Sequence, residues 1–406
     1  MPSLNQSRFI EEAIRSVLDQ PVEGLQLMVA DGGSTDGTLA ILERLTVESK
    51  GRLTWFSERD SGTAQAVNKA MARSRGEIIG WLNSDDVYAP GAAVRAIEHF
   101  ARNPRHRMVY GRGVQIDECG RSLGEYPTRP PTTPFEAFAE GCFICQPTVF
   151  FRRSLVEEIG GLDESLATAF DFDWWLRAFK RYGKFQIGYV DEVQAYSRLH
   201  GGSITSRLRR RVALEGMAVL ARHLGEVPGA WLLTYVEELL SRYPFVEETW
   251  EPREHLRELR EEARPYLNSA ERQTLADRLS FDYRLRLATR EACVAVHPDG
   301  WAGPRLSVRV RALDRKLKEI VLRCRHAWPD HRPLGIRVIT PWGAIIQGVV
   351  DRPGSFELRI SLPESDPPAQ WCITVQSSAA FVPREVEPGS DDTRELAFKV
   401  EGLEVL

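Results

Sequence analysis

The stretch that decides the fold is residues 80–88, with the sequence GWLNSDDVY. It continues an apolar run that starts at Ile78 and predicts the end of a buried strand. A turn signal, Pro90-Gly91, follows it. In open α/β sheets, ligands bind at the carboxyl ends of such strands. The two adjacent acids therefore lie where a ligand is expected.

The acid pair, Asp85 and Asp86, has two interpretations. Neighbouring carboxylates repel each other unless a positive group lies beside them. A hard divalent cation prefers oxygen ligands and often carries substrate phosphates as well. Asp is also a favoured residue at a helix start, so a solvated turn before a helix near Pro90 fits the same residues. The pattern alone leaves both interpretations open.

Composition limits the class of protein. The 406 residues suffice for two or three domains at roughly 100–200 residues each. The net charge is -4 and there is no basic stripe, which argues against nucleic acid as a partner. The cationic cluster 207–211 (RLRRR) fits a solvated helix face or, alternatively, a patch on an anionic membrane. The six cysteines are too scattered for a disulfide scaffold.

No apolar run of about 18 residues predicts a membrane span, and the N-terminus lacks the pattern of a signal peptide. We therefore expect a cytoplasmic protein. Peripheral contact with the inner face of the membrane is compatible with the cationic cluster.

Strands and helices alternate in the first half of the chain. The predicted elements are helix 8–20, strand 25–30, helix 38–45, strand 53–56, helix 62–74 and strand 77–82. This alternation predicts an α/β fold with a mostly parallel sheet and flanking helices. Residues 1–6 predict only a loop, where such a sheet normally has a strand. We expect that the first β-strand is absent or that the true start lies upstream of Met1.

The second half has a different pattern. Residues 206–290 combine helical periodicity with many charges and predict a segment of solvent-facing helices. Residues 291–406 show short alternating runs separated by turns, which predict a small β-sandwich. The predicted strands are 306–312, 320–324, 335–340, 344–349, 356–362, 371–376 and 396–400. Three domains follow: 1–205, 206–290 and 291–406.

A second polar loop, residues 31–38 (DGGSTDGT), lies between a predicted strand and a predicted helix. Its glycines allow the backbone to pass close to a ligand. Asp31 can accept hydrogen bonds from a base or a ribose. A turn followed by a helix cap explains the same residues, so this loop also stays open.

Five segments together, in order and spacing, resemble family 2 glycosyltransferases of the GT-A fold. They are residues 3–6 (SLNQ), 13–20 (AIRSVLDQ), 31–38 (DGGSTDGT), 58–70 (ERDSGTAQAVNKA) and 81–86 (WLNSDD). The resemblance extends over about residues 1–205 and implies a GT-A domain, the fold of nucleotide-diphospho-sugar transferases. The C-terminal β-region more weakly resembles accessory domains of bacterial polysaccharide-building enzymes.

The resemblance implies roles for individual residues. Asp171 matches the catalytic base. The residues matched to nucleotide-sugar binding are Asn5, Asp31, Gly33, Asn68, Lys69, Asn83 and Asp85. The residues matched to a divalent metal, Mg²⁺ or Mn²⁺, are Asp86, Asp85 and His200. The chain departs from the family pattern at Asn83 and Phe170, where acids are common, and at Gln65, where many members have Asp.

The function that the resemblance implies is inverting, metal-dependent glycosyl transfer in cell-surface polysaccharide biosynthesis. The donor would be a UDP-, GDP- or dTDP-sugar, and the acceptor a glycan or a lipid-linked glycan. Two alternatives remain. The departures from the pattern fit a non-catalytic glycan-binding or scaffold protein with a degenerate nucleotide pocket. A nucleotidyltransferase needs a basic loop for the triphosphate, and residues 32–37 contain no Lys or Arg.

Overall fold

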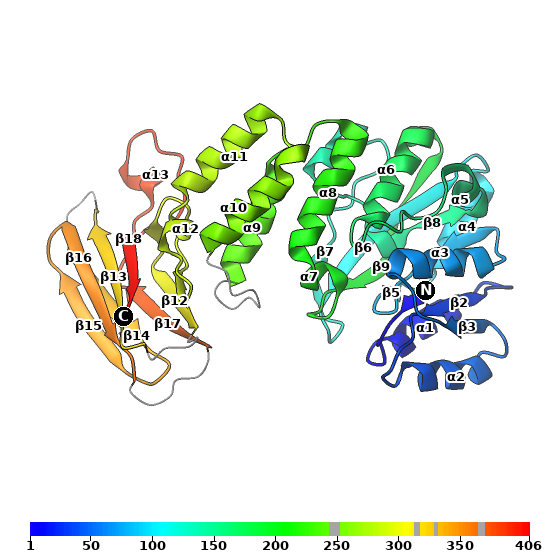
Figure 1. The fold of residues 1–406 in the computed structure, drawn as a ribbon, viewed down its shortest axis with the longest axis horizontal. Coiled ribbons are helices and arrows are strands. Elements are labelled where there is room, and N and C mark those ends of the chain that lie inside the picture. The colour runs from blue at the N-terminus through cyan, green and yellow to red at the C-terminus, as the bar shows by residue number, and fades with distance from the viewer. Residues whose placement is uncertain (243–251, 312–316, 329–331, 364–369) are drawn as a thin grey trace. The chain divides into compact units, whose positions relative to one another are not determined.

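The computed structural model describes residues 1–242, 252–311, 317–328, 332–363 and 370–406. The chain forms two compact units, Met1–Trp231 and Leu232–Leu406 (Figure 1). Each unit contains a hydrophobic core of its own. Among the described residues, no helix has both the length and the apolar character needed to cross a membrane.

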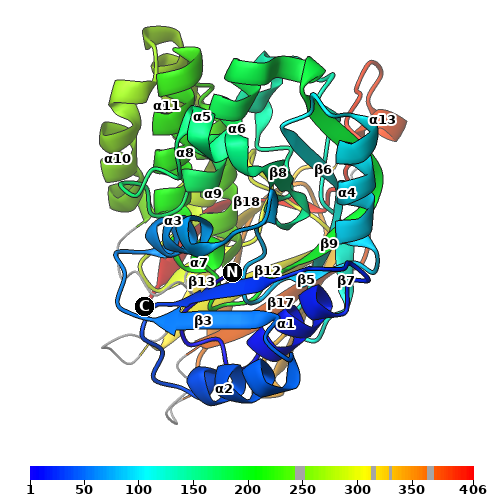
Figure 2. The same ribbon diagram turned by 90° about the vertical axis from the view of Figure 1, so that its right-hand side faces the viewer.

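The first unit begins with a three-stranded parallel sheet in the order β1-β2-β3. Its elements are β1 (Pro2–Ser3), α1 (Ile10–Leu18), β2 (Leu27–Asp31), α2 (Thr38–Glu48), β3 (Leu53–Ser57) and α3 (Thr63–Arg73). Helices α1 and α2 cover one face and α3 the other (Figure 2). The predicted alternation of helices and strands is confirmed here, because the apolar positions of α1 recur on one helical face, which is buried.

The expectation of a loop alone before the first helix is wrong. Pro2 and Ser3 form β1, in which Pro2 lies opposite Ala30 and Ser3 opposite Asp31. The amide of Ala30 donates to the carbonyl of Met1 over 2.9 Å, extending the pairing by one position. A strand of two residues is too short to produce an alternating pattern, which is why the sequence did not reveal it.

A six-stranded mixed sheet completes the first unit, in the order β4-β8-β6-β9-β5 with β7 paired to β6. The strands are β4 (Ile78–Gly80), β5 (Val87–Tyr88), β6 (Met108–Ile116), β7 (Ser122–Glu125), β8 (Phe150–Arg152) and β9 (Ile187–Arg198). The long β6–β9 pair is parallel, whereas β4–β8, β6–β8, β6–β7 and β5–β9 are antiparallel.

Strands β6 and β9 escaped prediction. Two glycines interrupt the apolar pattern of β6. A Cβ at Gly113 would collide with the side chain of Cys145, and one at Gly111 with the carbonyl of Val190. Close packing requires glycine at both positions, so a residue that weakens a strand signal is here part of the strand.

The remaining helices of the first unit pack on the mixed sheet. They are α4 (Ala92–Arg102), α5 (Arg153–Ile159), α6 (Phe170–Tyr182), α7 (Ile204–Arg207) and α8 (Arg209–Leu224), with short 3-10 turns at Phe135–Glu140, Gln146–Thr148 and Gly183–Phe185. Trp174 and Trp175 of α6 are fully buried. Trp174 meets the ring of Phe151 edge-on at 4.8 Å, and its Nε1 donates to the carbonyl of Gly160 over 2.8 Å. Helix α6 is thereby fixed on the sheet.

The later part of the chain contains helices followed by a β-sandwich. The helices are α9 (Ala230–Arg242), α10 (Pro252–Ala263), α11 (Ser269–Phe281) and α12 (Tyr283–Leu287). The two antiparallel sheets have the orders β10-β12-β17-β14-β15 and β11-β18-β13-β16. Apolar side chains from both sheets, such as Val308 and Ile373 from one and Leu322 and Phe398 from the other, form a single core. The predicted sandwich is confirmed.

All seven predicted strands of the sandwich are present. They are β12 (Arg305–Arg311), β13 (Glu319–His326), β14 (Leu334–Ile339), β15 (Ile345–Val350), β16 (Gly354–Ser361), β17 (Gln370–Ser377) and β18 (Phe398–Val405). The predicted end of the first strand at Ala312 lies outside the described residues. The short strands β10 (Ala292–Val294) and β11 (Trp301–Ala302) and the short helix α13 (Pro383–Val386) were not predicted.

We predict that Trp174→Ala lowers the free energy of unfolding of the first unit by about 3–5 kcal/mol, because it empties a closed aromatic core. Urea unfolding followed by circular dichroism measures the loss. The matched control is Phe185→Ala, which truncates an aromatic ring that is 78% exposed. An effect within about 0.5 kcal/mol is expected there. Equal effects of the two changes would contradict the prediction.

Candidate functional site

The glycine-rich loop 31–38 is organised by Asp31, which is 1% exposed at the end of β2. One oxygen of its carboxylate accepts hydrogen bonds from the amides of Gly33 and Ser34 and from the hydroxyl of Ser57, at 3.0, 2.9 and 2.6 Å. The other oxygen accepts from the hydroxyl of Ser34. A carboxylate has about four acceptor positions. The geometry therefore gives Asp31 a clear role in shaping the loop.

The loop after β1 is bound to the glycine-rich loop. Asn5 has a positive φ of 53°, a conformation that Asn tolerates better than most residues. Its amide donates to the hydroxyl of Ser34 over 2.8 Å, and its side-chain oxygen accepts from the amide of Thr35 over 2.8 Å. Gly33, which directly precedes Ser34, has a φ of 88°. The sequence predicted separate ligand contacts for Asn5, Asp31 and Gly33. In the structure, hydrogen bonds join all three residues in one pair of connected loops.

The acid pair lies in the turn between β4 and β5. Asp86 is 4% exposed, and its carboxylate accepts from the backbone amide of Arg198 at 2.9 Å and from the side chain of Asn83 at 3.2 Å. Burial and the charge of Asp85 raise the pKa of Asp86 well above its ordinary value, and the two hydrogen bonds only partly offset this. A positive ion beside the pair would stabilise the charged form.

Asp85 is paired with His200. The Nε2 of His200 lies 3.0 Å from a carboxylate oxygen of Asp85, and the imidazole packs on the ring of Phe9 with ring centres 4.8 Å apart. The sequence resemblance had matched these two residues to one metal site, and the structure brings them into contact. His200 reaches the acid pair from the end of β9, 115 residues farther along the chain.

Arg198 was missed by the sequence analysis. Its guanidinium is buried, donates to the carbonyl of Asp85 over 2.9 Å and forms an ion pair with Glu12 at 2.7 Å. The backbone amide of Arg198 also donates a hydrogen bond to Asp86, so these contacts together fix both acids against β9. A single Arg in a strand carries no pattern signal. The one signal that could have drawn attention to Arg198 is its position two residues before His200.

These residues fit a divalent cation that is held jointly by protein and substrate. The described residues contain no group of three or more His, Cys, Asp or Glu that could enclose a metal ion. Mg²⁺ is usually bound by one or two carboxylates together with substrate phosphates and water. Asp85 and Asp86 provide that share of the ligands, and His200 lies next to them.

Asp171 is the second residue of α6 and differs from its neighbour Asp173. Burial raises the pKa of Asp171 to about 6, although the amide of Phe172 donates to it over 2.7 Å. Asp173 is also buried, but hydrogen bonds and ion pairs with His223 and Arg177 hold its pKa below the ordinary value. Within the described part of the chain, Asp171 has no such ion pair.

Trp81 joins the acid-pair turn to the helix of Asp171. Its ring stacks on Phe170 with centres 6.0 Å apart and also contacts Trp175 at 6.2 Å. Its carbonyl accepts from the side chain of Gln146 over 2.7 Å, and Gln146 in turn accepts from Asn83 over 2.7 Å. Phe170, which departs from the family pattern, therefore packs on the residue that precedes the acid-pair turn.

Asn68 and Lys69 on α3 make internal contacts. The Asn68 amide group exchanges hydrogen bonds with the backbone of Leu162 at 2.8 and 2.9 Å and donates to Glu164. Lys69 forms an ion pair with Glu58 at 3.0 Å. Gln65 also donates to Glu164, over 3.0 Å. These contacts anchor the loop that leads to α6, and the predicted roles of Asn68 and Lys69 in nucleotide binding stay predictions.

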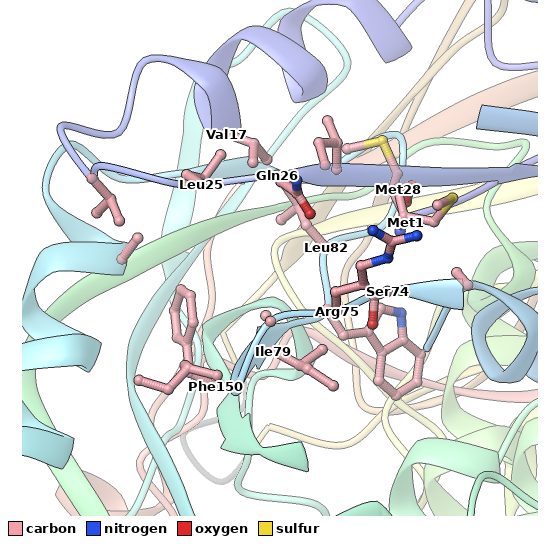
Figure 3. A pocket seen from close by; sticks show the side chains of 18 of the residues that line it. Met1, Val17, Leu25, Gln26, Met28, Ser74, Arg75, Ile79, Leu82 and Phe150 are labelled. Carbon is pink, nitrogen blue, oxygen red and sulfur yellow. Dashed lines mark hydrogen bonds between the residues drawn. The ribbon is translucent and has the colours of Figure 1, made fainter. Parts of the chain in front are cut away.

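A separate pocket of about 530 Å³ is lined by residues of β2 and β4 and the segments around them (Figure 3). Most of its lining is apolar, with Leu25, Leu82 and Phe150 among the labelled side chains. None of the predicted site residues lines it. This pocket is therefore distinct from the candidate site.

Comparison with known proteins agrees with the resemblance seen in the sequence. Residues 1–160 match the family model of glycosyl transferase family 2. The match covers 160 of the 406 residues. The matched region includes the first sheet and the helices that flank it.

Two curated relatives and one solved structure illustrate the similarity. An uncharacterized glycosyltransferase of Rickettsia conorii is 26% identical over 212 residues, which is 49% of this chain and 33% of that protein. The chondroitin synthase of Escherichia coli is 28% identical over 206 residues, 51% of this chain and 29% of that enzyme. The chain thus spans a third or less of these relatives. A crystal structure of S. aureus TarS has 13% identity and a TM-score of 0.47, covering 92% of this chain and 71% of that chain.

We predict that Asp31→Ala lowers the free energy of unfolding by about 2–4 kcal/mol, because it leaves two backbone amides of the loop and the hydroxyl groups of Ser34 and Ser57 without their acceptor. Ser57→Ala removes one of these bonds and should cost about 1 kcal/mol. Chemical denaturation measures both. An Asp31→Ala protein as stable as the wild type would show that the carboxylate does not support the loop.

Proposed function

We propose that this protein is an inverting glycosyltransferase that moves a sugar from a nucleotide-diphosphate sugar to a glycan or lipid-linked acceptor. The observation that carries the proposal is a chain that matches family 2 over residues 1–160 and packs its acid-pair turn on the helix that carries a second acidic group. The second group is a carboxylate with a raised pKa, Asp171, and the first is the acid pair Asp85-Asp86. Trp81 and Phe170 pack between the two segments that carry them.

Asp171 is the proposed general base. The acceptor hydroxyl must lose its proton as it attacks the anomeric carbon, and a carboxylate accepts that proton best when its pKa lies near the working pH. Burial brings the pKa of Asp171 to about 6, and no ion pair within the described residues ties up its charge. The buried Asp173 is less suited, because His223 and Arg177 already hold its carboxylate.

Asp85 and Asp86 are the proposed binding site for the donor diphosphate and its divalent cation, Mg²⁺ or Mn²⁺. The cation, when bound, supplies Lewis-acid stabilisation of the negative charge on the leaving diphosphate. The chain's own residues orient the two acids: His200 contacts Asp85, and the backbone of Arg198 contacts Asp86. A single base that acts on the acceptor and is separate from the acids that bind the diphosphate corresponds to direct displacement with inversion.

The donor side of the proposal includes the residues matched through the resemblance. Asp31 and Asn83 would contact the nucleotide sugar, together with Asn5, Gly33, Asn68 and Lys69. The nucleotide would be UDP, GDP or dTDP. Relatives named chondroitin synthase and hyaluronan synthase motivate a polysaccharide as the product.

The domain division 1–205, 206–290 and 291–406 is part of the proposal, with transfer assigned to the first domain. We further propose that the protein works on the cytoplasmic side of the cell, with peripheral contact at the membrane. Vesicle co-sedimentation with and without anionic lipid tests that contact.

We predict that Asp171→Asn lowers kcat by about 10²- to 10⁴-fold, because the acceptor proton loses its positioned base. The wild-type rate should rise with pH up to about 6 and then level off, since only the deprotonated carboxylate accepts a proton. The residual activity of Asp171→Asn should lack this rise. Transfer assays across pH 4.5–8 (roughly the range set by the unperturbed and raised pKa values) measure both effects. A near-normal rate for the variant would refute the assignment.

We predict that transfer needs a divalent cation and depends on Asp86. EDTA should abolish transfer, and Mn²⁺ or Mg²⁺ should restore it in the wild type but not in Asp86→Ala. Isothermal calorimetry with UDP and with GDP, each with and without Mn²⁺, should show tighter binding with the ion in the wild type only. Asp191→Ala is the matched control, at a side chain that is 79% exposed. Absence of nucleotide binding in every condition would favour a non-catalytic scaffold.

A further inference from the structure

Glu215 on α8 makes an unusual set of contacts with the segment that enters α6. Its carboxylate accepts hydrogen bonds from three consecutive backbone amides: Thr168 at 2.7 Å, Ala167 at 3.1 Å and Ala169 at 3.2 Å. It also accepts from the hydroxyl of Thr168 over 2.7 Å. Consecutive amides that converge in this way form a concave site for an anion. Here the anion is a side chain from another helix.

These contacts hold the start of α6. Ala169 is the residue immediately before the helix, and its own side chain provides no cap. A carboxylate at a helix N-terminus is favoured by the helix dipole and satisfies amides that lack partners within the helix. The hydrogen bonds from the loop lower the pKa of Glu215 although burial raises it, so the group is charged near neutral pH. Glu215 therefore acts as a cap supplied by α8.

Helix α8 holds α6 at a second point. Arg222 and His223, from the last turn of α8, contact the carboxylate of Asp173 at 3.2 and 2.9 Å. The two helices lie side by side in both views (Figures 1 and 2). Asp171 lies between the two points of attachment, two residues after Ala169 and two before Asp173. Both attachments come from residues outside the region 1–160 that matches the family model.

We propose that Glu215 is a positioning residue for the transfer reaction: it fixes the backbone at 167–169 and thereby the place of the Asp171 carboxylate. The inference rests on the proposed function, in which Asp171 is the base. Asp171 has no ion pair within the described residues to orient it, so its position depends on the backbone at the start of α6. A displacement of about 1 Å in a reacting group can cost on the order of 10²-fold in rate.

The test compares Glu215→Gln with two control variants. A glutamine keeps the size of the side chain, but it has one acceptor oxygen and an NH₂ group that faces the same amides. Arg211→Gln removes the ion pair on the exposed side of Glu215, which is 2.7 Å long, and leaves its carboxylate intact. Glu157→Gln makes the same chemical change on the exposed face of α5. Transfer is measured with whichever UDP- or GDP-sugar gives the highest wild-type rate.

For Glu215→Gln we expect kcat to fall at least tenfold, with the donor KM and the calorimetric Kd for UDP or GDP within twofold of the wild type. Hydrogen exchange of the amides at 167–169 should be faster. Both control variants should keep wild-type kinetics. The split between kcat and KM separates positioning from general loss of structure.

Two results would overturn the inference alone: a kcat within twofold of the wild type, or a parallel loss of kcat and nucleotide binding in a protein that still melts cooperatively. The second result would mean that Glu215 supports the domain as a whole. Failure of the wild-type protein to transfer any sugar would instead refute the proposed function, and the positioning role with it.

Discussion

The candidate site depends on the burial of one carboxylate, that of Asp86, directly beside a second one, that of Asp85. Asp86 is almost fully buried beside Asp85, and the cost of that arrangement appears as the raised pKa of Asp86. Strand β9 compensates part of this cost through the amide of Arg198, which donates to Asp86. His200, two residues after the end of β9, contacts Asp85. Because β9 also pairs with β5 and β6, the mixed sheet is what keeps the acids in place.

Arg198 shows how this compensation is built. A buried guanidinium is costly unless its donors are satisfied. It donates to the backbone carbonyls of Asp85, Asp117 and Glu118 and pairs with Glu12 on α1. One side chain thus connects the acid-pair turn, the β6–β7 connection and the first helix. The charge of Arg198 favours the ionised form of Asp86, although the guanidinium forms its ion pair with Glu12.

Aromatic side chains pack between the acid-pair turn and α6. Trp81 stacks on Phe170 and contacts Trp175, and Trp174 on the same helix is enclosed by Phe151. Such contacts are closely packed and deform little. The start of α6 is held in addition by the polar contacts from α8, so that apolar and polar constraints converge on the segment around Asp171.

Much of the fold was predictable because its signals are local. The helices of the first sheet and the seven sandwich strands follow from periodicities of 3.6 and 2. Strands β6 and β9 were missed because glycines and acids interrupt their patterns. Those glycines leave room for Cys145 and Val190, which are distant in the sequence. The reason for the glycines is therefore visible only in the folded structure.

The sequence by itself determined the residue types of the site and their order: the glycine-rich loop, the acid pair and Asp171. The tertiary structure alone decided how each is used. Asp31 accepts hydrogen bonds from its loop and from Ser57, and His200 is paired with Asp85. Among the described residues, Asp173 is held in ion pairs and Asp171 is not. The reason is physical. Chemical type is local, whereas the pKa and the hydrogen-bond partners of a buried group depend on neighbours that only folding brings together.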